Sequence, residues 1–197
     1  MFFQIQEIID QLDVTISPFE GSLIIKEESH QAALMSWLPS NSTCSLLYRG
    51  STDGKRPADF HRCCDNKGPT LVLIKSGEYI FGGYTSKSWE SADKFKADDH
   101  SFLFTLISPS GTQPIRLSAE PSADRDNGGI LCRTHSGPCF GSKSYFNLEV
   151  SNAVEGYNYL RATNTGFICP PNVTRAFTPE ENFNIRELEI FKVNFES

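Results

Sequence analysis

Residues 46–90 constrain the fold of this 197-residue chain more tightly than any other stretch. They comprise a short apolar run, a turn, a short helical stretch that ends at Gly68-Pro69, and a hairpin that contains Gly82 and Gly83. Two adjacent glycines inside a strand indicate that the strand bends or that another part of the chain approaches its backbone closely. The segment therefore predicts a fold in which backbone geometry at these positions matters more than side-chain reactivity.

Further apolar runs, separated by turn signals, predict several more strands. Residues 70–75 and 102–107 are continuously apolar, which is typical of central strands covered on both faces. Ser76-Gly77 is expected to connect the first of these to the second strand of the hairpin. In the glycine- and proline-rich stretch that follows, short strands are expected around residues 114–117 and 130–133, with another at residues 145–150.

The last predicted strand covers residues 183–193. Within it, Leu188 and Ile190 alternate with Glu187 and Glu189, and successive side chains of a strand point to opposite faces. We therefore expect one face of this strand to be buried and the other, which carries both glutamates, to lie in water.

Two helices are predicted before and within the strand-rich region. One covers residues 26–38, with Leu34 and Trp37 among its core-facing residues, and it ends at Pro39. The other follows a turn at residues 51–54 and begins at Pro57, since proline suits a first helical position.

The first 18 residues have a helical pattern of their own. Ile5, Ile8, Ile9 and Leu12 follow the spacing that puts four apolar side chains on one helical stripe, and residues 13–18 break it. This helix either packs on the domain or is the end of a coiled coil or a linker from a longer protein. Residues 19–197 are expected to form a single domain, because a chain of this size can bury one substantial core.

The pattern of elements predicts the fold class. Many short strands, two or three helices and no regular alternation of strand and helix argue against a doubly wound parallel sheet. The predicted fold is mainly β (α+β), a two-sheet antiparallel β-sandwich flanked by a few short helices. The 15 phenylalanines predict an interior rich in aromatic rings.

Charge and cysteine content exclude some classes of function. A net charge of −6 with scattered basic residues argues against nucleic acid as a partner, and no apolar run is long enough for membrane insertion. The chain opens without the pattern of a secretory signal, so its six cysteines are expected to be free, mostly buried thiols in the cytoplasm. Sequons at Asn41 and Asn172 favour the alternative, a secreted protein with disulfides.

No coherent catalytic group can be assembled from the sequence, so no catalytic residue is predicted. Of the four histidines (His30, His61, His100 and His135), only His61 lies close to thiols, those of Cys63 and Cys64. Positions two and three apart on a helix do not form a nucleophile–base pair with a third orienting group. Cys63 and Cys64 are candidates for redox chemistry, although core packing explains them more simply.

Two weak candidates for metal sites are present, and no cofactor is predicted. Cys132, His135 and Cys139 are the nearest approach to a zinc set but lack a fourth ligand, and the two cysteines would suit a small disulfide loop in an exported protein. Asp124 and Asp126 resemble the start of a calcium loop without its closing glutamate, and a hairpin turn at residues 127–128 explains the same stretch.

The motifs of residues 46–90 resemble the core signature of the TLDc family. They read Leu-Leu-Tyr-Arg-Gly-Ser-Thr-Asp-Gly, Phe-His-Arg-Cys-Cys-Asp-Asn-Lys-Gly-Pro-Thr and Tyr-Ile-Phe-Gly-Gly-Tyr-Thr-Ser-Lys-Ser-Trp-Glu. The likeness extends over about residues 20–195 and includes the Gly-Pro-Cys-Phe-Gly stretch at residues 137–141. Six residues match the family's glycines and aromatics, and we interpret them as structural: Gly68, Phe81, Gly82, Gly83, Trp89 and Gly141.

The resemblance implies a two-sheet β-sandwich that acts as a non-enzymatic protein-interaction module. Members of the family are associated with resistance to oxidative stress and with binding and regulation of the vacuolar proton-pumping ATPase, which makes that pump the first candidate partner. Two alternatives remain open. One is a redox-active thiol protein or another enzyme, and the other is a secreted β-sandwich that binds glycans or a cell-surface partner.

Overall fold

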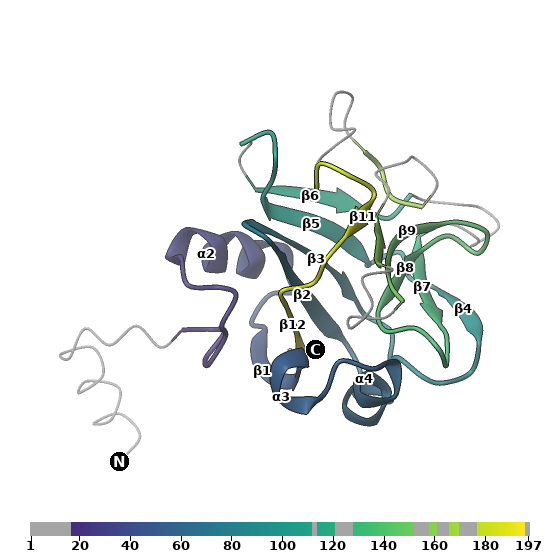
Figure 1. Cartoon of the computed structure of the whole chain (residues 1–197). Coiled ribbons are helices and arrows are strands. Elements are labelled where there is room, and N and C mark those ends of the chain that lie inside the picture. The colour runs from purple at the N-terminus through teal and green to yellow at the C-terminus, as the bar shows by residue number, and fades with distance from the viewer. Residues whose placement is uncertain are drawn as a thin grey trace, which may run out of the picture.

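Two antiparallel sheets of six strands each stack face to face, and a helix covers the outer face of one of them (Figure 1). The computed structural model describes residues 17–111, 114–120, 128–151, 158–160, 166–169 and 177–195. The predicted mainly β, two-sheet antiparallel sandwich is confirmed. The helix predicted from Ile5, Ile8, Ile9 and Leu12 lies outside the described residues, and none of the described helices is long and apolar enough to cross a membrane.

The first sheet has the strand order β1-β12-β2-β3-β5-β6. Its strands are β1 (Thr43–Arg49), β2 (Thr70–Ser76), β3 (Tyr79–Thr85), β5 (Phe102–Ile107), β6 (Ile115–Ser118) and β12 (Glu187–Asn194). One face packs on the second sheet, and the other is covered by α2 (Glu28–Trp37) and by residues 17–25. Because both faces are covered, β2 and β5 are buried along almost their whole length, as their continuous apolar sequences predict.

The second sheet has the strand order β11-β10-β9-β8-β7-β4 and is made largely from short strands. Its strands are β4 (Lys94–Ala97), β7 (Gly129–Cys132), β8 (Cys139–Gly141), β9 (Phe146–Val150), β10 (Asn158–Leu160) and β11 (Asn182–Phe183). In Figure 1 this sheet lies opposite the face of the first sheet that carries α2. The sequence missed β4, β8 and β10, since runs of three or four residues are too short to show alternation.

Two further short helices lie at the end where β1 and β12 meet. The predicted turn at residues 51–54 is instead a helix, α3 (Gly50–Asp53), closed by Gly54 with a φ of +110°. The predicted helix from Pro57 is α4 (Pro57–Cys64). The hairpin of β2 and β3 turns at residues 77–78, where Gly77 has a φ of +58°, and it pairs Ser76 with Tyr79.

The predicted strand over residues 183–193 is wrong in one respect, because two strands occupy this stretch. β11 belongs to the second sheet and β12 to the first, so the chain crosses between the layers at residues 184–186. Apolar and polar residues alternate on both sides of this crossing, because each strand faces the same interior from its own side, so the alternation by itself does not show it.

The expectation that Glu189 lies in water is also wrong. Its side chain is fully buried, because residues 17–25 cover the outer face of β12, where Phe19 packs edge-to-face on Phe191 at 5.5 Å. Its carboxylate accepts hydrogen bonds from Ser22 Oγ at 2.6 Å, Leu23 N at 2.8 Å and Arg49 Nε at 2.9 Å. One buried anion thus fastens residues 17–25 to β1 and β12.

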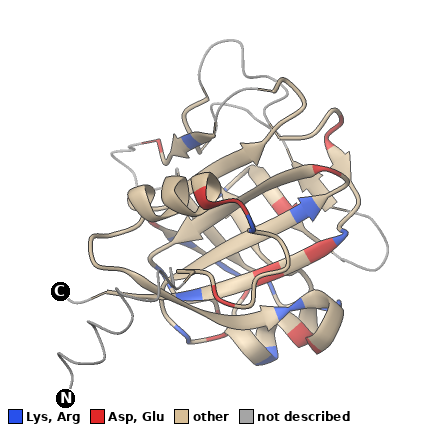
Figure 2. Ribbon diagram, turned by 90° about the vertical axis from the view of Figure 1, so that its left-hand side faces the viewer, with Lys and Arg blue, Asp and Glu red and all other residues tan. Residues whose placement is uncertain are grey.

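Charges of both signs are interspersed over the face that carries α2 (Figure 2). The acidic excess therefore comes from the whole chain, with 24 acidic and 18 basic residues, and not from one acidic surface on this face. Interspersed charge gives a surface little long-range preference for one class of polyion.

Glu189→Gln should destabilise the fold by about 3 kcal/mol, because an amide placed against three donors leaves a buried cation and two donors poorly paired. Urea unfolding followed by tryptophan fluorescence measures the change. Glu187→Gln is the matched control, since that carboxylate lies two residues earlier and is only partly buried, and it should cost less than about 1 kcal/mol. Equal losses in the two variants would contradict the role of Glu189.

Candidate interaction site

The two adjacent glycines of β3 face opposite sides of the first sheet. A side chain on Gly83 would place its Cβ 2.8 Å from Cζ of Phe140 in the facing sheet. A side chain on Gly82 would overlap the carbonyl oxygen of Val72 on β2 and lie 2.9 Å from Cζ of Phe104. At both positions, neighbouring groups occupy the space that a side chain would need.

The other two signature glycines differ from each other in what they provide. Gly68 has a φ of +86° and open space around it, so its need is conformational. Gly141 on β8 lies against the carbonyl oxygen of Tyr145, which a Cβ would overlap. None of the four glycines exposes a reactive group, and each shapes the backbone or the packing.

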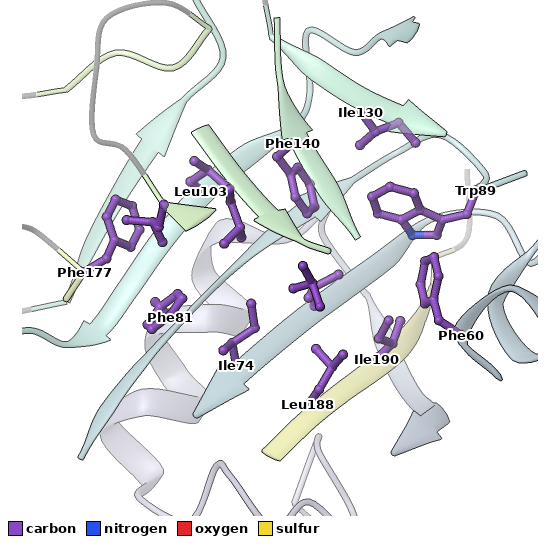
Figure 3. Close-up of a cluster of buried hydrophobic side chains, with 14 of the residues drawn as sticks. Phe60, Ile74, Phe81, Trp89, Leu103, Ile130, Phe140, Phe177, Leu188 and Ile190 are labelled. Carbon is purple, nitrogen blue, oxygen red and sulfur yellow. The ribbon is translucent and has the colours of Figure 1, made fainter. Parts of the chain in front are cut away.

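Trp89 is fully buried in the core between the sheets, at the side of the cluster next to α4 (Figure 3). Its ring lies edge-on to Phe140 of the second sheet and to Phe60 of α4, with both centroids at 5.5 Å. Its Nε1 donates to Thr70 Oγ1 on β2 at 2.8 Å, so the one polar atom of the ring is satisfied. Trp89 therefore joins α4, the first sheet and the second sheet at a single point.

Phe81 packs between the two sheets at the other end of β2 and β3 (Figure 3). It is fully buried and meets Phe183 at 5.1 Å and Phe177 at 6.0 Å, both edge-to-face. The signature aromatics are thus core side chains, and no ligand could reach them without opening the sandwich.

His61 is a buried side chain of α4 that contacts the loop joining β7 to β8. Its Nδ1 lies 2.8 Å from a carboxylate oxygen of Asp65, and its Nε2 lies 2.8 Å and 3.0 Å from the backbone oxygens of Arg133 and Ser136. The ring therefore links Asp65, just after α4, to two backbone carbonyls of the β7–β8 loop. The i, i+4 spacing of His61 and Asp65 was the signal available in the sequence.

Ser136 and Glu149 form a second buried polar pair next to His61, and this pair is not a catalytic arrangement. Ser136 Oγ donates to Glu149 Oε1 at 3.0 Å, and Arg133 Nη1 lies 3.3 Å from the same oxygen. A nucleophilic serine would need its hydroxyl on a histidine nitrogen, whereas His61 contacts only the carbonyl oxygen of Ser136. The arrangement holds the β7–β8 loop closed instead.

The candidate redox thiols Cys63 and Cys64 lie on α4, with Cys64 fully buried and Cys63 partly so. Burial raises the pKa of both thiols above the ordinary value, and the thiolate is the reactive form. Burial also raises the pKa of Cys44 to about 11. Two of the remaining thiols, Cys132 and Cys139, are free and buried, and their pKa values are raised for the same reason.

The candidate metal ligands are not gathered into a site. Cys132 and Cys139 are buried, whereas His135 is exposed, and within the described residues no three His, Cys, Asp or Glu side chains could hold a metal ion together. Asp124 and Asp126 lie outside the described residues.

The hollows of the described surface include two that are wide enough to hold a side chain. One, of about 420 Å³, lies between the β2–β3 turn and residues 178–184, and its lining includes Tyr79 and Phe183. The other, of about 380 Å³, lies between the end of α2 and the edge of the first sheet, with a lining that includes Trp37, Tyr84 and Arg116. Each hollow is lined by segments that are distant in sequence, so sequence reasoning missed both.

The family model of the TLDc domain matches residues 19–194. The chain is 29% identical over 150 residues to MTOR-associated protein MEAK7 of Gallus gallus, which covers 75% of this chain and 31% of that protein. It is 46% identical over 63 residues to the Danio rerio protein of the same name, covering 32% of this chain and 14% of that one.

A third relative is Interferon-induced protein 44 of Homo sapiens, to which the chain is 47% identical over 47 residues, or 23% of this chain and 10% of that protein. The chain therefore spans less than a third of the length of each of these relatives.

Gly83→Ala should lower the free energy of unfolding by about 1–3 kcal/mol, because the added methyl group displaces the Phe140 ring from a close-packed core. Gly83→Val should cost more. Thermal unfolding measures both. Gly50→Ala is the control, since a Cβ there meets no atom closer than 3.5 Å. An unchanged melting temperature for Gly83→Val, together with loss of binding, would contradict the structural interpretation.

The thiols should react slowly with dithionitrobenzoate in the native protein at pH 8 and rapidly after unfolding in guanidinium. The reason is that each raised pKa leaves little thiolate in the folded state, and for Cys44 the rate should rise only as the pH approaches about 11. Absorbance of the released thiolate follows the reaction. A native thiol that reacts at neutral pH as fast as free cysteine would favour a redox role.

Proposed function

Since this chain belongs to the TLDc domain family, we propose that it is a non-enzymatic protein-interaction module of that type. One observation carries the proposal: Gly82, Gly83 and Gly141 of the family signature lie where the backbone packs closely, and its aromatics are buried in the core. A rigid scaffold of this kind presents its loops and edges to a partner.

The chemistry of the described residues supports a role without catalysis. The nearest approach to a catalytic group, around His61 and Ser136, is fully engaged in holding a loop closed. The thiols whose pKa values are raised by burial are poor nucleophiles at neutral pH. Both facts weigh against the redox-thiol alternative.

The partner we propose first is the vacuolar proton-pumping ATPase, with resistance to oxidative stress as a consequence of that association. The resemblance of residues 46–90 to the TLDc signature supports this partner. A cytoplasmic location is part of the same proposal. Free buried thiols such as Cys132 and Cys139 suit a reducing compartment better than the secreted alternative.

A second partner is favoured by the relatives. Two of them are named MTOR-associated protein, and one aligns with 75% of this chain. We therefore propose an mTOR-containing assembly as the second candidate, reached either directly or through a shared complex.

Affinity capture tests both partners. The full chain, tagged at its carboxyl terminus, should enrich subunits of the proton pump or of an mTOR assembly from lysate, as measured by quantitative mass spectrometry. An excess of untagged chain added to the lysate should abolish the enrichment, because a specific surface saturates. Association should then be reproduced with purified components by size-exclusion chromatography. Recovery of neither assembly would contradict these partners, and turnover of a small molecule by the purified chain would contradict a non-enzymatic role.

A further inference from the structure

The hollow beside α2 differs from the rest of the described surface in its lining. It is walled by Trp37 and Leu38 at the end of α2, by Tyr84 on β3, and by Phe195 after β12, and it has a volume of about 380 Å³. Pockets of about 300–1,000 Å³ hold drug-sized ligands or a few side chains of a peptide. Its walls are firm, since Tyr84 stacks on Phe102 at 5.2 Å and Trp37 lies edge-on to the same ring at 6.4 Å.

Arg116 is held at the rim of this hollow in a defined position. Its guanidinium carbon lies 4.5 Å from the centroid of the Phe102 ring, a cation–π contact that fixes the side chain without using its N–H groups. Among the described residues Arg116 has no ion pair and no hydrogen-bond partner for its side chain. A planar fork of donors is thus presented to whatever enters the hollow.

Other described groups of the hollow can also donate hydrogen bonds. Neither the indole N–H of Trp37 nor the hydroxyl of Tyr84 has a hydrogen-bond partner within the described part of the chain. His100 lies at the exposed rim, and none of the described lining residues is acidic. Asp98, two residues before His100, is buried, and its carboxylate accepts hydrogen bonds from Thr85 and Ser86, whereas Asp99 is exposed.

The charge of the hollow is therefore opposite to that of the whole chain. In a protein of net charge −6, a largely apolar hollow that has an arginine at its rim, and no acidic residue in the described part of its lining, is complementary to an anion that carries an apolar group. Arginine and tryptophan are also the residues that most often dominate binding energy at protein interfaces.

We propose that this hollow binds a short peptide segment of a partner protein in which an aspartate or glutamate lies next to a large apolar residue. The carboxylate pairs with the Arg116 guanidinium, and the apolar side chain fills the space between Trp37, Tyr84 and Phe195. The inference rests on the proposed function, because it names the kind of segment that an interaction module of this chain would recognise.

Selection from a random decapeptide display library against the folded full-length chain tests the proposal. The enriched peptides should share an acidic residue within a few positions of leucine, phenylalanine or tryptophan. Anisotropy of the best peptide, fluorescently labelled, should show binding at least about tenfold weaker to Arg116→Glu, because a charge-assisted pair is replaced by repulsion. Arg116→Lys should bind with intermediate affinity, since it keeps the charge and loses the fork.

Arg186→Glu is the matched control. Arg186 is exposed, has no ion pair among the described residues, and precedes β12, whereas Phe195 of the hollow follows that strand at its other end. It should change peptide affinity by less than about twofold, and equal melting temperatures would show that all three variants fold. Enriched peptides without acidic residues, no enrichment at all, or equal affinity for Arg116→Glu would overturn the proposal.

Two further outcomes separate this proposal from the proposed function. Complete displacement of the peptide by inorganic phosphate at constant ionic strength would assign the hollow to a free anion and overturn the peptide. If lysate capture by wild type and by Arg116→Glu recovers the same assembly equally, the hollow is not the contact and the interaction module stands. If no assembly is captured while peptides bind through Arg116, the peptide site stands and the proposed assemblies fail.

Discussion

The contact between the bare backbone of Gly83 and the ring of Phe140 sets how closely the two sheets approach. The nearest ring atom lies 2.8 Å from where a Cβ would be, so the first sheet can pack closely against the second only because residue 83 is glycine. From Phe140 the packing continues through Trp89 to Phe60, which brings α4 onto the same core. On the other face of β3, Gly82 gives the same close fit to Phe104 under α2. Residues of one short sequence segment thus set the close packing on both faces of the first sheet.

A sheet buried on both faces needs covers, and buried polar side chains hold them in place. Glu189 fastens residues 17–25, His61 fastens the β7–β8 loop to α4, and Asp98 fastens the end of β3 to the start of β5. Each of these groups is satisfied by several partners, which is the condition under which a buried charge or dipole can be tolerated. Removing one partner would therefore loosen a cover before it disturbed the core.

This division of labour separates the family signature from recognition. The signature specifies how tightly the layers pack, and a partner cannot touch side chains that lie between them. Recognition is left to surfaces assembled from the ends of elements, such as the hollow formed by α2, β3, β6 and residue 195. Members of one family can then share a scaffold and differ in partner, because lining residues such as Arg116 and Phe195 lie outside the signature segment.

The sequence alone determined the fold class and the central strands, because these follow from apolar runs and turn signals. The structural roles of Gly82, Gly83 and Trp89 are predictions that rest on the family resemblance. The sequence did not reveal that Glu189 is buried, since the cover over β12 comes from residues more than 160 positions away. Nor did it reveal that residues 183–193 cross between sheets, or that Trp37, Tyr84 and Arg116 meet. Burial and cavity lining are properties of long-range contacts, and only the tertiary structure brings those residues together.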